Sequence, residues 1–548
     1  MKKTSLRSLS VLLCLGILLL AITGCTTGVT TTGTTTGTTK ATTTAQTTQT
    51  TGTTKPAEPV TISAWCRFTP NAAATGIQTY SDQLVWKEIK DRLNIDVQWE
   101  HPGDTDYNAA LGLLMASGDL PDFIGIISPT LAAQYGTQGA LISLQDLIAD
   151  ECPELTQLMT DMPKVKGETT SPDGNIYFFP RILKDPEVKN WPGWIIRGDW
   201  LEEINMDAPD KIEDVIPVLT ALKEKDQARY PYFGTPLYMI WWYGIGGKFG
   251  NNSTYFVVEN NNLVFGPLDD RYKEAVTFIH ELFEKGLIHP DYLTNNTAKN
   301  DELMMQGISG LTYGSHVGAL VKYNNMLEAG DLNPGWIPMY PPQNSAGERM
   351  SLGRHNDIDP SCGAAITVSS KYATEIAQMM NYFYSKEGQM LLYFGVEGDT
   401  YVADPGNPLE YKYTDKCFEN KAIDLATYLN NFVGHISTFP SAIPKFHQLN
   451  LYTRPEALQA NAMAVETMSD KKFPNVPLLP EELKRIQEID RDMATFIEEN
   501  THGFIMGNLS IDDKYDDFLA GMKSLGSDEY ISIYTTAYAR FMEATKVG

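Results

Sequence analysis

Cysteine and positive charge are both scarce in this chain. Its 548 residues include six cysteines, too few for the disulfide framework that small secreted domains use in place of a large core. Lysine and arginine number 43 against 68 aspartates and glutamates, which gives a formal charge of −25. An acidic surface repels nucleic-acid phosphates and anionic lipid headgroups. These shortages exclude a disulfide scaffold and argue against a nucleic-acid-binding protein.

The four cysteines beyond residue 25 are spread along the chain. No two of them have the C-x-x-C spacing that zinc and redox sites use. Buried free thiols and a single disulfide in an exported protein are both compatible with this spacing. The four are Cys66, Cys152, Cys362 and Cys417.

Recognisable catalytic and cofactor motifs are also missing. None of the eight histidines stands in an H-E-x-x-H motif, and neither a phosphate-binding loop nor G-x-G-x-x-G is present. The segment GSHVG at 314–318 has its serine in the second position rather than the third, so it is not a nucleophile elbow. Carboxylates are plentiful, and whether two of them form a glycosidase pair depends on geometry that a sequence does not contain. Because the recognisable motifs are missing, we predict no enzyme activity and no cofactor.

Three side chains that can bind metals lie close together in the sequence, namely His355, Asp357 and Asp359. Metal sites need further ligands and a supporting shell of hydrogen bonds. A solvated polar loop therefore explains this group better than a metal site, and we predict no bound metal.

The N-terminus has the parts of an export signal. Basic residues precede an apolar run at 9–22, which is too short to span a membrane comfortably. The run ends in ITGC at 22–25, which resembles the lipobox of bacterial lipoproteins and implies cleavage before Cys25 and acylation of its thiol. A plain secretory signal with a chance cysteine is the alternative. Residues 1–24 are thus predicted to be a lipoprotein signal peptide.

Residues 25–59 are the lipidated cysteine and a threonine-rich tail without apolar periodicity. Such a composition cannot form a packed core, so we predict a flexible linker, with its O-glycosylation left open. Removing Lys2, Lys3 and Arg7 with the signal peptide takes away three positive charges and changes the formal charge from −25 to −28. No later apolar run of ~20 residues is present. The lipid on Cys25, the flexible linker and the globular part that follows it together predict a protein on the extracellular face of the cell membrane.

The globular part begins at Val60, where strand-like and helix-like segments start to alternate. This alternation predicts a parallel sheet with helical crossovers, and ligands bind beyond the carboxyl ends of such strands. The strand-like segments are 60–65, 95–99 and 123–127, and the helix-like ones lie near 81–93 and 107–116. Further helices are expected at 274–286, 375–384, 480–499, 511–525 and 528–543.

Aromatic side chains gather in segments rich in glycine and proline. Trp241, Trp242 and Tyr243 are consecutive in one of them. Three consecutive side chains cannot all point into one core face, and flat rings beside polar groups suit sugar rings as well as peptide side chains. Ordinary core packing is the alternative for any single tryptophan. We interpret the cluster as part of a ligand cleft.

Five segments of this chain resemble segments that occur in the same order in the extracellular solute-binding proteins of family 1. The resemblance is to the lipoprotein branch of that family, which is common in Gram-positive bacteria. Each segment is weak evidence alone, but the five together are specific, and the resemblance covers residues 60–548. They are LMASGDLPD at 114–122, SPDGNIY at 171–177, IRGDWL at 196–201, EKGLIHPD at 284–291, and GVEG at 395–398 with Tyr401. Their turns and helix ends read mostly as scaffold.

The resemblance implies a two-lobed α/β fold of the type II periplasmic-binding-protein kind, with a ligand cleft between the lobes and a helical C-terminal region. Closure of a hinge around the ligand would then be recognised by the permease of an ABC importer. Some relatives carry a calcium loop after the DWL segment, whereas this chain reads KEKDQARY at 223–230, so no calcium is expected there. The expected lobes are approximately 60–175 with 315–405, and 176–314 with 406–548.

Aromatic and charged side chains at the expected cleft are our candidates for ligand binding. Aromatic rings stack on the apolar faces of sugars, and charged planar groups bind vicinal hydroxyls in pairs. The expected stacking platforms are Trp65, Trp241, Trp242, Tyr243 and Trp336, and the expected hydrogen-bonding partners are Arg354, Asp357 and Glu397.

The expected function is capture of an oligosaccharide by a lipid-anchored monomer and its delivery to ABC permease subunits. The same fold would serve for a peptide or another small solute, or for a sensor that hands its solute to a membrane receptor. A surface glycoside hydrolase is disfavoured because no catalytic constellation accompanies the family segments. The chain has no ATP-binding loop, so a partner must supply the energy for transport.

Overall fold

The structure is a computed structural model whose internal contacts divide the chain into two units, residues 1–56 and 57–548. The described residues all belong to the second unit. They are 58–69, 75–103, 106–189, 193–247, 254–294, 296–314, 316–351, 356–406, 409–420, 423, 425–434 and 439–545. The signal peptide, Cys25 and nearly all of the linker therefore lie outside the described residues.

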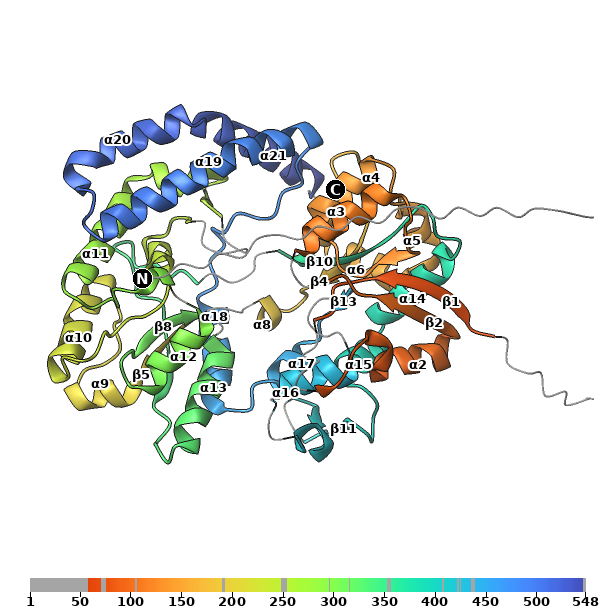
Figure 1. The fold of residues 1–548 in the computed structure, drawn as a ribbon, viewed down its shortest axis with the longest axis horizontal. Helices are drawn as coiled ribbons and strands as arrows, with labels where there is room; N and C mark the ends of the chain where they lie inside the picture. The colour runs from red at the N-terminus through yellow and green to blue at the C-terminus, as the bar shows by residue number, and fades with distance from the viewer. Residues whose placement is uncertain are drawn as a thin grey trace, which may run out of the picture. The chain divides into compact units, whose positions relative to one another are not determined.

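A six-stranded sheet organises one part of the globular unit (Figure 1). β1 pairs in parallel with β2 and with β3, as the alternation of strands and helices predicts. β10 lies between β3 and β4 and is antiparallel to both, and β13 is parallel to β4. The strands are β1 (Val60–Trp65), β2 (Ile95–Glu100), β3 (Phe123–Ile124), β4 (Phe179–Ile182), β10 (Ile358–Ile366) and β13 (Ser441–Ala442).

Helices α2 (Leu84–Leu93) and α3 (Tyr107–Ser117) connect the first three strands, close to where we predict them. The Asp106 side chain caps α3, and Gly118 ends it with φ 73°, a conformation that glycine adopts easily. β3 is shorter than predicted because its continuation bonds to two different strands. The Gly125 N–H donates to the Trp65 carbonyl of β1, and the Ile127 N–H donates to the Gly363 carbonyl of β10.

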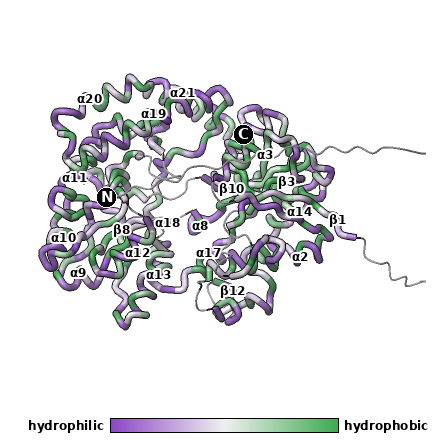
Figure 2. The backbone as a smooth tube through the Cα atoms, viewed as in Figure 1, coloured by the Kyte–Doolittle hydropathy of each residue, from purple (hydrophilic) through white to green (hydrophobic). Residues whose placement is uncertain are grey.

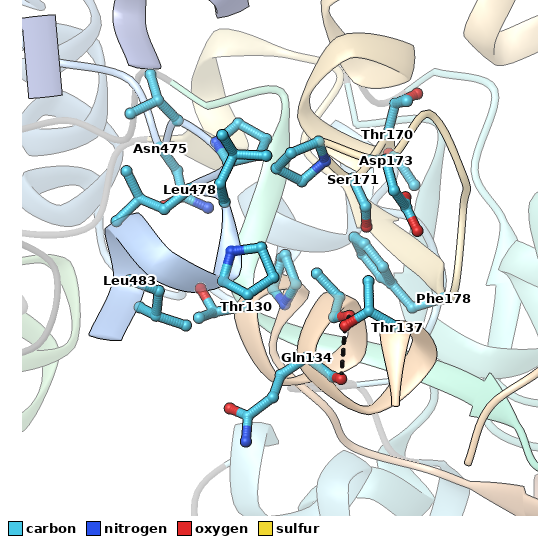
Figure 3. Close-up of a pocket in the computed structure, with 18 of the residues that line it drawn as sticks. Thr130, Gln134, Thr137, Thr170, Ser171, Asp173, Phe178, Asn475, Leu478 and Leu483 are labelled. Atoms are coloured by element: carbon cyan, nitrogen blue, oxygen red, sulfur yellow. Dashed lines mark hydrogen bonds between the residues drawn. The ribbon is translucent and has the colours of Figure 1, made fainter. Parts of the chain in front are cut away.

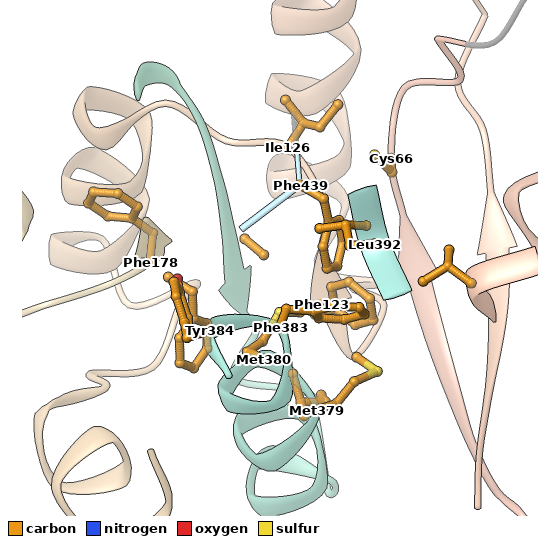
Figure 4. Close-up of a cluster of buried hydrophobic side chains, with 14 of the residues drawn as sticks. Cys66, Phe123, Ile126, Phe178, Met379, Met380, Phe383, Tyr384, Leu392 and Phe439 are labelled. Carbon is orange, nitrogen blue, oxygen red and sulfur yellow. The ribbon is translucent and has the colours of Figure 1, made fainter. Parts of the chain in front are cut away.

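A first hydrophobic cluster fills the space between this sheet and α14 (Ala373–Tyr384). Figure 4 shows Phe123 of β3 beside Met379 and Phe383 of α14, with Phe439 near them. Figure 2 shows hydrophobic residues concentrated around β3, β10 and α14. The four cysteines beyond residue 25 are all buried and stand outside any disulfide among the described residues, which agrees with the first of the two alternatives that the sequence left open.

A second sheet, of order β8-β5-β9, is antiparallel throughout. It consists of β5 (Gly193–Arg197), β8 (Leu311–Gly314) and β9 (Trp336–Met339). The helices of this region are α9 (Gly198–Ile204), α10 (Ile212–Lys225), α11 (Asp270–Glu284), α12 (Thr297–Met305) and α13 (His316–Ala329).

Three C-terminal helices complete this second region, as predicted from their periodicity. They are α19 (Pro480–Ile505), α20 (Ile511–Ser524) and α21 (Ser527–Ala544). α19 begins with proline at its first turn, where a missing N–H costs nothing, and it packs along α11 (Figure 1).

The remaining elements are shorter. The helices are α4 (Pro129–Thr137), α5 (Gln145–Glu151), α6 (Pro153–Asp161), α7 (Pro163–Thr169), α8 (Pro186–Lys189), α15 (Lys386–Tyr393), α16 (Leu425–Tyr428), α17 (Lys445–Asn450) and α18 (Pro455–Glu466). β6 (Phe256–Glu259) pairs with β7 (Asn262–Phe265), and β11 (Tyr401–Ala403) pairs with β12 (Tyr411–Tyr413). Among the described residues, no helix combines the length and the apolar character needed to cross a membrane.

The hydrophobic clusters are interleaved along the sequence. The buried members of the first lie between 62 and 188 and between 358 and 443, whereas those of the second and third lie between 194 and 339 and between 452 and 541. This division differs from the expected lobes, because 176–188 and 406–443 pack in the first cluster and 315–339 pack outside it. We therefore propose lobes of about 58–188 with 358–447, and 193–345 with 452–545.

Candidate ligand-binding cavity

A cavity of 420 Å³ lies between the first cluster and the start of α19 (Figure 3). One wall is α4, which follows the carboxyl end of β3 after only four residues. Ser128 caps this helix by accepting a hydrogen bond from the Leu131 N–H at 3.3 Å, and Pro129 occupies its first position. Thr130, Gln134 and Thr137 of α4 all lie along the cavity in Figure 3.

The second wall is the turn that follows α7. Ser171 and the residues after it form a tight turn in which the Ser171 N–H donates to the Asn175 carbonyl and the Gly174 N–H donates to the Ser171 carbonyl. Asp173 accepts hydrogen bonds from Asn175 and from the Tyr177 hydroxyl at 2.7 Å. Partial burial opposes ionisation, but these hydrogen bonds hold the pKa of Asp173 below its usual value. The turn is therefore held by its own hydrogen bonds where it borders the cavity.

The third wall is the segment 475–483, which enters α19 from the second region. The Asn475 N–H donates to Asn356 Oδ1 at 3.0 Å and so ties this segment to the residues that precede β10. Glu482 accepts from the Leu479 N–H at 2.8 Å and forms an ion pair with Arg540 of α21 at 2.6 Å. The wall is therefore held by contacts to the first region on one side and to the C-terminal helices on the other.

The three walls give the cavity a mixed chemical character. Hydroxyl and amide groups stand beside the apolar surfaces of phenylalanine, leucine and proline. The polar lining includes Thr130, Gln134, Ser171 and Asn475, and the apolar lining includes Phe178, Leu478 and Leu483 (Figure 3). A volume of 420 Å³ is within the range of small-molecule sites. Such a cavity can bind a solute that has both C–H faces and hydroxyl groups.

One carboxyl group among the lining residues is almost fully buried. Glu168, near the end of α7, is 1% exposed, and its Oε2 accepts from the backbone N–H groups of Asp357 and Ile358 at 2.9 and 3.0 Å. Its Oε1 has no hydrogen-bond partner, although Lys164 Nζ lies 3.8 Å from it. Burial, with a smaller contribution from Asp357, raises the pKa of Glu168 to about 8 against the opposing effects of Lys164 and the two N–H groups.

Asp357, one of the expected ligand partners, donates its backbone N–H to Glu168 Oε2 and does not line the cavity. Its carboxylate forms an ion pair with Lys189 of α8 at 2.6 Å. Asp359 pairs in turn with Arg181 at 3.1 Å, and both side chains are buried. The described residues contain no group of three or more side chains that could hold a metal ion.

The expected stacking platforms are mostly core residues. Trp241 and Trp242 belong to a 3-10 helix, Pro236–Tyr243, and point into different clusters, so that both are 1% exposed or less. Trp242 packs on Trp194 at a ring-centroid distance of 4.6 Å. The two consecutive tryptophans can both be buried because each packs in a different hydrophobic cluster. Ordinary core packing, the alternative that the sequence left open, therefore describes both rings.

The other two tryptophans are also buried. Trp65 is 4% exposed and stacks on Tyr107 at 5.1 Å, and Trp336 is 1% exposed and packs on Tyr323 at 5.5 Å. Asn324 fixes Trp336 further through hydrogen bonds to its backbone N–H and carbonyl.

The remaining candidate ligand contacts do not lie together. Tyr243 is half-buried beside Phe278, at a centroid distance of 6.1 Å, and Glu397 is exposed in the turn before β11. Arg354 lies outside the described residues, as does Cys25. None of the seven candidate ligand contacts that the structure describes lines the cavity.

The lining residues were not singled out because their types are common at surfaces and helix starts. Two sequence signals point to them in retrospect. Ser128 and Pro129 form a cap and first-position pair directly after the third expected strand, where ligands bind. The prolines at 474, 477 and 480 mark an extended segment that leads into a long helix.

Comparison with known proteins identifies relatives along most of the chain. The family described as bacterial extracellular solute-binding protein matches residues 74–390. The fructooligosaccharide ABC transporter substrate-binding protein FusA of Streptococcus pneumoniae is 23% identical over 84% of this chain and 87% of its own length. Lipoprotein LipO of Bacillus subtilis is 25% identical over 59% of this chain and 64% of its own length.

Solved structures share the fold. The alginate-binding protein AlgQ2 without calcium ion has a TM-score of 0.72 at 23% identity, covering 88% of this chain and 98% of that one. FusA in complex with kestose has a TM-score of 0.69 at 22% identity, covering 88% of this chain and 99% of that one. The type II periplasmic-binding-protein-like fold and the family resemblance expected from the five segments are both confirmed. The chain belongs to the bacterial extracellular solute-binding proteins, the solute-binding components of ABC transporters.

Proposed function

We propose that this protein captures an oligosaccharide in the 420 Å³ cavity and delivers it to the permease subunits of an ABC importer. The observation that carries the proposal is the position and lining of the cavity. It lies between two separate hydrophobic clusters and combines hydroxyl and amide groups with apolar surfaces (Figure 3). Sugars present the same combination, because C–H groups cover ring faces whose edges carry hydroxyls.

The relatives support the ligand class, because FusA is named for fructooligosaccharides and a solved FusA structure holds kestose. The walls of the cavity come from both proposed lobes, so a ligand that contacts both walls stabilises a closed arrangement. We propose that the protein acts as a monomer without catalysis, anchored to the extracellular face of the membrane through lipid on Cys25.

A binding screen tests the proposal directly. The full chain, purified in detergent, is heated with oligosaccharides and with peptides, and unfolding midpoints are recorded. A ligand at 100 times its dissociation constant stabilises the folded state by about 2.7 kcal/mol, which raises the midpoint measurably. Recovery of the saccharide intact after incubation supports capture without hydrolysis. A cleaved saccharide would mean a hydrolase, and midpoints raised by peptides alone would overturn the ligand class.

A cavity-filling variant tests the location. Ala133→Trp places an indole ring in the cavity from α4 and is expected to weaken saccharide binding at least about 10-fold. Ala116→Trp is the matched control, because Ala116 is exposed near the end of α3, does not line the cavity, and is expected to leave the affinity unchanged. Equal affinity in both variants would place the sugar site elsewhere on the protein.

A further inference from the structure

The end of helix α21 contacts α7, which belongs to the first region. Figure 1 shows α21 extending from the C-terminal helices toward α3 and α4. Thr545, the C-cap residue of α21, lies against Gly167 in the interior of α7. A Cβ atom on Gly167 would overlap the Cγ2 methyl group of Thr545 and lie 3.9 Å from Phe541 Cε2. Glycine weakens the interior of a helix, so this close approach explains its presence in α7.

The methyl group of Thr545 is held facing α7. The Thr545 hydroxyl and the Thr545 backbone N–H both donate to the Phe541 carbonyl, each at 3.0 Å. Because threonine is branched at Cβ, a fixed hydroxyl also fixes the direction of the methyl group. The three atoms nearest to the missing Cβ of Gly167 are carbons, so this part of the contact can separate without breaking a hydrogen bond.

The contact joins the two proposed lobes. Val165 of α7 is buried in the first hydrophobic cluster, whereas Tyr538 and Phe541 of α21 are buried in the second. Each helix is therefore fixed to the core of its own lobe. A contact between them is made across the lobes rather than within one.

The same two helices hold the walls of the cavity. On the side of the first region, Gly167 directly precedes residues 168–173, all of which line the cavity. On the other side, Arg540 of α21 donates to the Pro477 carbonyl at 3.4 Å and pairs with Glu482 at 2.6 Å. Separation of α21 from α7 therefore also separates these two walls.

We infer that the contact between α7 and α21 is a latch that holds the two lobes together, and that its release is the movement that opens the cavity. The latch acts without a ligand, so this inference goes beyond the proposed function. A saccharide that touches both walls stabilises the same arrangement, so the latch and the saccharide reinforce each other. The latch then lengthens the time for which a captured saccharide stays bound.

The first experiment opens the latch in the ligand-free protein. Gly167→Trp places an indole ring between α7 and α21, and Lys166→Trp, at the exposed neighbouring position on α7, is the matched control. Hydrogen exchange of the full chain in detergent is followed by mass spectrometry. The informative segment is the wall at 475–483, where the Asn475 N–H donates to Asn356 Oδ1. Exchange there is expected to be about 10-fold faster in Gly167→Trp, because this bond is lost when the lobes separate.

Exchange in α14, which lies in the first core, is the internal control and should be the same in all three proteins. Equal exchange at 475–483 in Gly167→Trp and Lys166→Trp would overturn the latch. Faster exchange throughout Gly167→Trp, with α14 included, would show that the variant does not fold, and the second experiment then decides.

The second experiment closes the latch with a disulfide. The Cβ position of residue 167 is 3.6 Å from Thr545 Cβ, within the spacing of about 3.5–4.5 Å found in disulfides. Gly167→Cys with Thr545→Cys is therefore expected to form the bond under mild oxidation, and the two single variants are the controls. In the oxidised double variant, exchange at 475–483 should slow and radiolabelled kestose should dissociate at least about 10-fold more slowly. Dithiothreitol should restore both rates.

The outcomes separate the latch from the proposed function. Failure of the disulfide to form, or exchange at 475–483 that is the same before and after reduction, would overturn the latch whatever the protein binds. If kestose does not bind the unaltered protein, the tightest saccharide of the binding screen replaces it. If no saccharide binds, the proposed function fails, and hydrogen exchange alone decides whether the latch exists. Dissociation that is equally fast with and without the disulfide would overturn its effect on capture.

Discussion

Acid sensitivity of the folded state should depend strongly on one buried histidine, His447 of α17. Its side chain is in the first cluster region, 3% exposed, with Nδ1 2.9 Å from the Tyr413 hydroxyl oxygen. Burial, with a smaller contribution from the positive charge of Arg181, lowers the pKa of His447 from 6.5 to about 3. The unfolded chain therefore binds a proton at a pH where the folded protein does not.

The sign and size of the effect follow from this difference. Above pH 6.5 the histidine is neutral in both states and has no effect on the pH dependence of stability. As the pH falls below 6.5, protonation favours the unfolded chain by about 1.4 kcal/mol per pH unit until the folded pKa is reached. At pH 5 the loss is about 2 kcal/mol, a large part of the 5–15 kcal/mol typical of whole domains.

The assay is urea unfolding at pH 7.5 and at pH 5 for the unaltered protein and for His447→Gln, which does not titrate. The unaltered protein should lose about 2 kcal/mol more than the variant between the two pH values. Ser441→Ala is the control, because its hydroxyl is 2.7 Å from the Tyr393 hydroxyl in the same buried region but carries no titrating proton. An identical pH dependence in His447→Gln and the unaltered protein would refute the reasoning.

Two further substitutions test residues that the structure places in the core. Trp242→Ala should lower the free energy of unfolding by about 3–5 kcal/mol, because the ring is fully buried against Trp194. The affinity of the folded protein for sugar should not change. Stability is measured by urea unfolding and affinity by calorimetry, and a loss of affinity at unchanged stability would restore the stacking role. Arg181→Met should lower the free energy of unfolding by about 3–5 kcal/mol, because the buried carboxylate of Asp359 loses its guanidinium partner. The double variant, Arg181→Met with Asp359→Leu, should recover part of this loss of stability. A double variant no more stable than the single one would contradict that explanation.

The elements most readily predicted from the sequence are those whose signals are local. The alternation in 60–65, the cap at Asp106 and the periodicity of 511–525 depend on neighbours within one or two turns, and the corresponding strand and helices are present. The central position of β10 depends on pairing with β3 and β4, which precede it by more than 170 residues. No local pattern contains that information, so the sheet is mixed where the pattern predicts a parallel one.

The candidate site was harder to predict for a related reason. Burial of Trp241 and Trp242 depends on which distant segments receive them, such as Val257 and Met350 for the first and Phe278 for the second. Thr130 and Leu478 meet at the cavity although they are far apart in the sequence, and neither residue type is unusual. A sequence draws attention to tryptophan and tyrosine as candidate ligand contacts. The position of a cavity depends instead on how distant segments pack, and its walls consist of common residue types.

The insertion of β10 between β3 and β4 has a consequence for how the chain matures. Until residues 358–366 are available, β3 and β4 lack the strand that joins them, and the first cluster also lacks the residues up to 443. The second cluster likewise waits for the helices that end at Ala544. The first cluster cannot be completed before residue 443 has been made, nor the second before residue 541, and contacts this distant in sequence form slowly. The topology thus delays completion of both hydrophobic cores during synthesis, and a polypeptide with incomplete cores is easier to thread across a membrane than a folded one.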